Sequence, residues 1–283
     1  MAFIDDRLVE FKDMFERTIQ NEKKNGLKEK TSIIRSSRLI NLIHESVKQE
    51  LILQGIKKDY LHPPQGKSSP ELKIAGFLKR KKQDVCVTPN SREILKVPRR
   101  IDWGPFKYKR LQDELGEEYT EKTLVINVRS QLSSLAKNRD TLFERTFAEA
   151  LNLHMQYPKM VLGEVYLIPL YEYDEKAMEN EEPGSRIRFK DNPVKIEDYL
   201  SFFHEINHRS SDTDELHKYE RCALLIVDFR QKHPVLYTKE KLVAEGFLDE
   251  TFSRELSALS FDSFAKDILQ VYDKRFGLKN LTT

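Results

Sequence analysis

Two groups of charged residues in this 283-residue sequence could bind a divalent cation beside a phosphate. In the first group, Asp84 follows four consecutive cations at 79–82 and opens a short strand that we expect over 83–87. A carboxylate at a strand edge beside cations suits Mg²⁺, which uses one or two carboxylates together with water and phosphate oxygens. A capping role for Asp84, or an ion pair with a neighbouring lysine, is the alternative.

The second group begins in a strand predicted over 123–129 and continues into a helix predicted over 138–156. Glu149 lies seven residues after Leu142 and four before Leu153, so it shares the apolar stripe of that helix. A carboxylate at the edge of an apolar face is either paired or functional. Pairing with Arg145, four residues earlier, is the alternative.

Other familiar chemistry finds little support in the sequence. It has no glycine-rich phosphate loop, no HExxH zinc motif and no GxSxG nucleophile motif. The seven histidines lack metal-ligand spacing, and we expect Cys86 and Cys222 to be small buried residues in strands. Trp103 and Asp228 are also interpreted as structural. The pattern therefore disfavours nucleotide-driven and zinc-driven reactions.

The charge of the chain is unevenly distributed. The formal net charge is +2, yet residues 57–110 contain 15 Lys and Arg against 5 Asp and Glu, a local charge of +10 that leaves −8 elsewhere. A local excess of this size indicates a polyanionic partner. A solvated loop is the alternative. No apolar stretch approaches the roughly 20 residues that span a bilayer, and the acidic N-terminus does not resemble a signal peptide, so we expect a cytoplasmic protein without a membrane partner.

The expected elements alternate in a way that predicts an α/β (α+β) fold, with a central mixed β-sheet flanked by helices. Amphipathic helices over 4–22 and 32–54 form an N-terminal helical segment, residues 1–60, which precedes a domain over 61–283 or is continuous with it. A short helix is expected to open at Pro70-Glu71. The remaining predictions are strands over 160–169 and 222–229 and helices over 196–207, 239–245 and 261–276.

The strand–helix unit LVINVRSQLSSLAKNRDTLFERTFAEALNL (124–153) resembles that of type II restriction endonucleases of the PD-(D/E)xK superfamily. It is most similar to the branch that cuts CCGG and CCNGG sites, in which the second acid lies on the helix after the strand. The resemblance is clearest over 84–169. It implies a restriction-endonuclease-like fold and the Mg²⁺-dependent hydrolysis of double-stranded DNA to leave 5′-phosphates.

The resemblance assigns the reacting residues by position. Asp84 matches the first acid, although Gln83 replaces the usual proline before it, and Glu149 matches the acid on the helix, with Glu144 as its competitor. Two residues compete for the place of the family's lysine. Alignment by strand position puts Arg129 there, whereas alignment by the spacing to Glu149 puts Lys137 there. Arginine is always charged, so it cannot exchange a proton as lysine can.

The resemblance also implies contacts with metal and DNA. Glu71 matches a glutamate that the family often places before the first strand, near the metal. Residues expected to contact DNA are Arg139, Asp140 and Arg145, which would read bases in the major groove, and Lys81 and Lys82, which would bind phosphates.

Cutting both strands implies a homodimer, and a cell that carries such a nuclease would need a cognate DNA methyltransferase. Two other hypotheses remain open. The absence of an acid-x-Lys motif on the strand favours a non-catalytic DNA-binding subunit of a multi-protein restriction system. An enzyme acting on RNA or a nucleotide is the third, which the Arg/Asp segment argues against.

Overall fold

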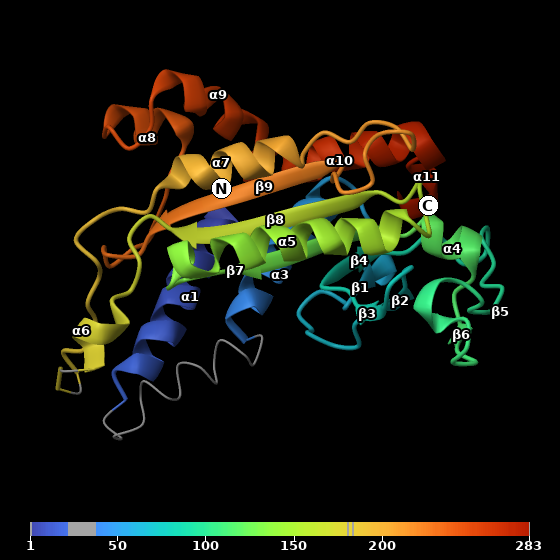
Figure 1. Ribbon diagram of the computed structural model, residues 1–283, viewed down its shortest axis with the longest axis horizontal. Coiled ribbons are helices and arrows are strands. Elements are labelled where there is room, and N and C mark those ends of the chain that lie inside the picture. The colour runs from blue at the N-terminus through green and yellow to red at the C-terminus, as the bar shows by residue number, and fades with distance from the viewer. Residues whose placement is uncertain (1, 22–37, 180, 183, 283) are drawn as a thin grey trace.

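The protein is described here by a computed structural model that covers residues 2–21, 38–179, 181–182 and 184–282. A six-stranded mixed sheet lies between two layers of helices, which confirms the predicted fold class (Figure 1). The sheet has the order β1 (Leu61–His62), β4 (Val85–Val87), β7 (Leu124–Ser130), β8 (Leu162–Pro169), β9 (Arg221–Asp228) and β10 (Val235–Leu236).

Strands β7, β8 and β9 are parallel, and the outer pairs are antiparallel. Central parallel strands are covered on both faces, which is why their sequences are almost continuously apolar. Every residue of β8 is buried. Gly163 of β8 is required by this packing, because a Cβ atom there would lie 2.7 Å from the ring of Phe264.

Helices cover both faces of the sheet. One face packs against α1 (Ala2–Ile19), α3 (Arg38–Leu53), α10 (Phe261–Phe276) and α11 (Lys279–Thr282). The other face packs against α5 (Leu135–His154), α7 (Ile196–Glu205), α8 (Lys239–Ala244) and α9 (Glu250–Ala258). Figure 1 shows α5 and α7 in front of the sheet. The strand–helix–strand connections through α5 and α7 account for the parallel order of β7, β8 and β9.

The N-terminal helices belong to the same hydrophobic core as the sheet. Leu8 and Phe15 of α1 and Ile43 of α3 pack in one cluster with Ile126 and Val165 of the strands. Residues 32–37 of the second predicted helix lie outside the described residues. Helix α9 was not predicted.

Small elements surround the main layers. The hairpin β2 (Lys73–Ala75) and β3 (Arg80–Lys82) lies beside the sheet, and a second hairpin joins β5 (Arg99–Arg100) to β6 (Gln112–Asp113). The short helices are α4 (Glu117–Glu121), α6 (Glu175–Glu179) and the 3₁₀ turns Lys58–Tyr60 and Gly104–Phe106. No helix within the described parts of the chain is long and apolar enough to cross a bilayer.

The helix predicted to open at Pro70-Glu71 is wrong. The chain there is extended, and Lys73–Ala75 pairs with Arg80–Lys82 instead. The carbonyl of Leu72 also accepts a hydrogen bond from the backbone of Gln83. Exposed Lys73 is followed by buried Ile74, and Gly76 ends the segment after a few residues, a length and pattern that favour a strand over a helix.

Candidate active site

Three polar residues of neighbouring strands lie in one row on the face that α5 covers. Val85 pairs with Ile126, which brings Asp84 beside Asn127, and Asn127 pairs in turn with Glu164 of β8. Oδ2 of Asp84, just before β4, accepts a hydrogen bond of 2.9 Å from the backbone of Val128. The sheet register thus gathers two carboxylates and an amide that are far apart in the sequence.

Helix α5 places a third carboxylate above this row. Glu149 is 7% exposed, and its oxygens lie 3.2 Å from Nζ of Lys79 and 2.8 Å from Nζ of Lys81. Burial alone would raise the pKa of Glu149, but Lys81, Arg129 and Lys79 together lower it, so the carboxylate is ionised at neutral pH. The pairing of Glu149 with Arg145 that the helical spacing allowed does not form.

The two lysines reach Glu149 because the β2–β3 hairpin is attached to α5. Oδ1 of Asn152, one turn after Glu149, accepts hydrogen bonds from the backbone of Leu78 and Lys79 at 2.8 and 2.9 Å. A Cβ atom at Gly76 would lie 2.4 Å from the Asn152 side chain, so only glycine allows this approach.

The guanidinium group of Arg129 lies within this cluster of carboxylates. Its Nε atom is 3.2 Å from Oε1 of Glu164, and its side chain is 17% exposed. Burial alone would lower the pKa of Arg129, but Glu164 and the other nearby anions, Glu149 and Asp84 among them, raise it overall. Burial raises the pKa of the fully buried Glu164 to about 7, against the opposing effect of Arg129.

Asn127 and Glu164 are buried without standard hydrogen bonds. No side-chain oxygen or nitrogen of either residue has a well-formed hydrogen bond with another described residue, although the Asn127 amide is close enough to lower the pKa of Glu164. Buried polar groups normally have partners, and a bound ion or water is a common explanation where the protein supplies none. Their oxygen atoms are of the type that hard cations bind.

Fewer than three ligands of the usual kinds converge here. Within the described ranges, no group of three or more His, Cys, Asp or Glu side chains could hold a metal ion. A metal at this place would therefore need oxygens from the Asn127 amide, water or substrate in addition to one or two carboxylates.

The structure brings together four of the residues predicted for the site: Asp84, Arg129, Glu149 and Lys81. Lys137 is not among them, because it is exposed on the first turn of α5 and precedes Glu149 by twelve residues, or about 18 Å along the helix axis. Glu144 is also exposed on α5. Of the paired alternatives, Arg129 and Glu149 are those that lie in the cluster.

The other predicted residues lie around this centre. Glu71 is 3.0 Å from Lys82 at the surface and forms no ion pair or hydrogen bond with the cluster residues Asp84, Arg129, Glu149 and Lys81. Arg139 forms ion pairs with Asp140 and Asp198 on the outer side of α5. Arg145 is exposed and lines a cavity at the end of β7.

Sequence reasoning missed Glu164 and Asn127 as site residues. Each is a polar residue inside an otherwise apolar strand, within MVLGEVYLIP and TLVINVR. This polar interruption could have identified them from the sequence, because a buried strand carries a carboxylate only where another group compensates its charge. Lys81 was expected to contact DNA, whereas the hairpin also places it on Glu149.

Residues interpreted as structural have structural contacts. Asp228, at the end of β9, is bound by Arg230 at 2.8 Å. Trp103 donates a hydrogen bond of 3.3 Å to the carbonyl of Gly76 and packs against Ala75 and Ile101. Cys86 and Cys222 are buried and free.

No protein-family model matches this chain, and no curated protein and no solved structure shows a significant similarity to it.

Proposed function

We propose that the protein is a Mg²⁺-dependent, sequence-specific endonuclease of double-stranded DNA that leaves 5′-phosphates. The observation that carries the proposal is the cluster of Asp84 and the buried Glu149 and Glu164 around Arg129, with lysines of a basic hairpin at its edge. Carboxylates that can hold Mg²⁺, beside cations that can stabilise the developing negative charge, supply what the hydrolysis of a phosphodiester requires.

The residues of the cluster divide the proposed chemistry. Asp84 and Glu149 would hold Mg²⁺, and Asn127 and Glu164 offer further oxygen atoms beneath them. Bound Mg²⁺ supplies a polarised phosphate and a water of lowered pKa. Arg129 offers a permanent positive charge to the developing oxyanion but cannot transfer a proton. Lys81 can do both, once substrate competes for its contact with Glu149.

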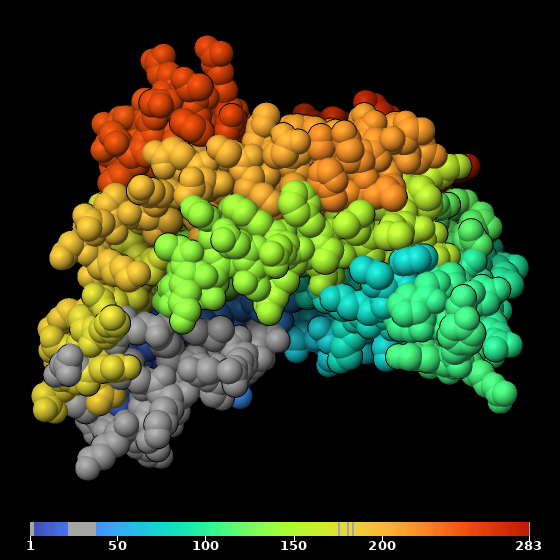
Figure 2. All heavy atoms as spheres, viewed as in Figure 1, coloured from blue at the N-terminus to red at the C-terminus, as the bar shows by residue number. Residues whose placement is uncertain are grey.

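The surface beside the cluster has the positive charge that binding of a DNA duplex would need. The segment from β2 to β6 carries most of the +10 excess and forms a lobe next to α5 (Figure 2). Lys79 and Lys82 are exposed there and would bind phosphates, which gives affinity without sequence preference. Arg139 and Asp140 on α5 would read bases.

The proposal extends to the assembly. A homodimer would present one cluster to each strand, and a cognate methyltransferase would protect the DNA of the cell, in the cytoplasm, from cleavage.

One observation favours a second candidate function, a non-catalytic DNA-binding subunit. Strand β7 carries Asn127 and Arg129 where the resembling enzymes carry an acid and a lysine, and Glu149 is already bound by two lysines. A protein of this kind would bind duplex DNA and leave it intact.

Incubation with unmethylated phage DNA, with and without Mg²⁺, separates the two. Discrete fragments that require Mg²⁺ and disappear with Asp84→Asn support the nuclease. Asp228→Asn is the matched control, because it removes a carboxylate that lies at the end of another strand and is bound by Arg230. Intact DNA with a salt-sensitive gel shift supports the binding subunit.

A further inference from the structure

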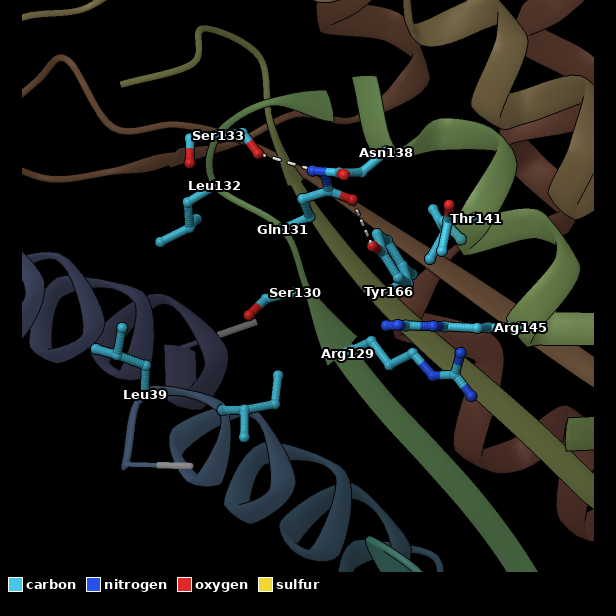
Figure 3. A pocket seen from close by; sticks show the side chains of 12 residues that line it. Leu39, Arg129, Ser130, Gln131, Leu132, Ser133, Asn138, Thr141, Arg145 and Tyr166 are labelled. Atoms are coloured by element: carbon cyan, nitrogen blue, oxygen red, sulfur yellow. Dashed lines mark hydrogen bonds between the residues drawn. The ribbon is translucent and has the colours of Figure 1, made fainter. Parts of the chain in front are cut away.

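A cavity of about 690 Å³ lies at the carboxyl end of β7, between α3 and α5 (Figure 3). We propose that it binds a nucleoside phosphate, with Arg145 and Arg129 on the phosphate. The proposal deepens the proposed function. If the bound nucleotide is part of a DNA strand, the proposal rests on that function. A free nucleotide has the same chemistry, and the test below separates the two sources.

The position of the cavity follows from the topology. The chain leaves β7 for α5 on one face of the sheet, while α3 covers the opposite face. A crevice therefore opens beyond the carboxyl end of the strand. In open α/β sheets, ligands bind in crevices of this kind.

The charged lining selects for an anion. Arg129 and Arg145 both border the cavity, and no carboxylate lines it within the described part of the chain. Arg145 is exposed and has no ion pair to any described residue, whereas Arg129 shares its Nε side with Glu164. Two guanidinium groups that border one cavity suit the oxygens of a phosphate.

The rest of the lining suits a nucleoside. Leu39, Ile40, Leu132 and Leu142 contribute apolar surface to the lining, and Asn138 and Thr141 of α5 offer polar atoms. Figure 3 shows the two arginines on the side of the cavity away from Leu39, with Tyr166 between strand and helix. The Tyr166 hydroxyl donates a hydrogen bond of 3.3 Å to Gln131, which fixes both side chains. The volume lies within the ~300–1,000 Å³ of small-molecule sites and exceeds what inorganic phosphate alone would fill.

The cavity is connected to the carboxylate cluster through one residue. Arg129 borders the cavity and contacts Glu164 of the cluster. A nucleotide held here would therefore lie next to the centre that is proposed to cut the strand.

The test is isothermal titration calorimetry without Mg²⁺, so that no cleavage can occur. The probes are the four deoxynucleoside 5′-monophosphates, inorganic phosphate and a short DNA duplex. Arg145→Ala should weaken binding of the nucleotide-containing probe at least tenfold, since a charge-assisted hydrogen bond is lost. Arg145→Lys should recover part of that loss, and Thr141→Leu, which fills the cavity, should also weaken binding.

Arg254→Ala is the matched control, because Arg254 is exposed on α9 and lines none of the described cavity. It should bind each probe within twofold of the wild type. If binding of a monophosphate depends on Arg145, the ligand of the cavity is a free nucleotide. If only binding of the duplex depends on Arg145, the ligand is a nucleotide within a DNA strand. Binding of all probes that is indifferent to both Arg145→Ala and Thr141→Leu, or no binding at all, overturns the proposal.

The nuclease proposal and the cavity proposal can fail independently, and the experiments tell the two failures apart. Nucleotide binding that depends on Arg145, together with DNA that stays intact in Mg²⁺, retains the cavity and rejects the nuclease. Cleavage with a KM unchanged by Arg145→Ala and Thr141→Leu retains the nuclease and rejects the cavity.

Discussion

The Nε atom of Arg129 lies 3.2 Å from Oε1 of Glu164, so the one arginine in the carboxylate cluster is paired with a side chain that water does not reach. A fixed guanidinium charge beside a fully buried carboxylate keeps both groups in place without a full set of hydrogen bonds. Because Arg129 and Glu164 are paired with each other, the groups left to contact metal and substrate are Asp84, Glu149 and the lysines of the hairpin. We call this side of the cluster its mouth.

The Glu164 carboxylate should make stability depend on pH. Burial raises its pKa from 4.5 to about 7, so the folded protein keeps a proton that the unfolded chain loses at lower pH. Its contribution is complete below about pH 4.5 and is lost as the pH rises through about 7, by up to about 3 kcal/mol. Urea unfolding at about pH 5 and about pH 8 should show this loss in the wild type and a smaller one in Glu164→Gln. Equal pH dependence of the two proteins would contradict the assignment.

The carboxylates at the mouth should be needed for cutting rather than for binding. Asp84→Asn and Glu149→Gln are each expected to lower cleavage roughly a hundredfold or more, since even indirect metal contacts are worth ~10–100-fold. Gel shifts without Mg²⁺ should move little, and Asp228→Asn should cut like the wild type. Loss of binding in parallel with cleavage would make Asp84 and Glu149 structural.

Mutagenesis can decide whether Arg129 or Lys137 is the positively charged side chain needed for cleavage. Arg129→Ala should abolish cleavage, because it removes the charge at the centre of the cluster, whereas the exposed Lys137→Ala should retain it. Lys81→Ala should also lower cleavage, and more so than Lys82→Ala, whose amine binds Glu71 at the surface. Initial rates on one plasmid compare the four variants. Full activity in Arg129→Ala would exclude it.

The effect of hairpin attachment on cleavage should be separable from its effect on the stability of the fold. Asn152→Ala removes three hydrogen bonds to the backbone of the hairpin and should lower the free energy of unfolding by about 2 kcal/mol. Asn207→Ala, a buried asparagine that also accepts two backbone hydrogen bonds, should cost a similar amount. Cleavage by the folded protein should fall only in Asn152→Ala, because only that change releases Lys79 and Lys81 from Glu149. Equal activities in the two variants would contradict this role.

Periodicity predicted the elements that bury apolar residues well. The strands around 124–130, 162–169 and 221–228 and the helix that carries Glu149 were predicted to within a few residues, because alternation and helical spacing are local properties of the chain. The Pro70-Glu71 segment failed, since its pairing with residues 80–82 is decided by a tertiary contact.

The site was predicted in part for the same reason. Asp84 and Glu149 carried visible signals in their neighbours, whereas Glu164 became meaningful only when the register of β7 and β8 set it opposite Asn127. Lys81 reached Glu149 only through the attachment of the hairpin at Asn152. Contacts between segments 70 residues apart have no signature in a single sequence.

Cleavage of unmethylated duplex DNA by the purified protein tests the central claim most directly. We predict discrete fragments with 5′-phosphate ends in Mg²⁺, none in EDTA, and none with Asp84→Asn under conditions in which Asp228→Asn cuts normally. DNA that remains intact in Mg²⁺, or fragments that Asp84→Asn still produces, would contradict the assignment of this carboxylate cluster as a nuclease centre.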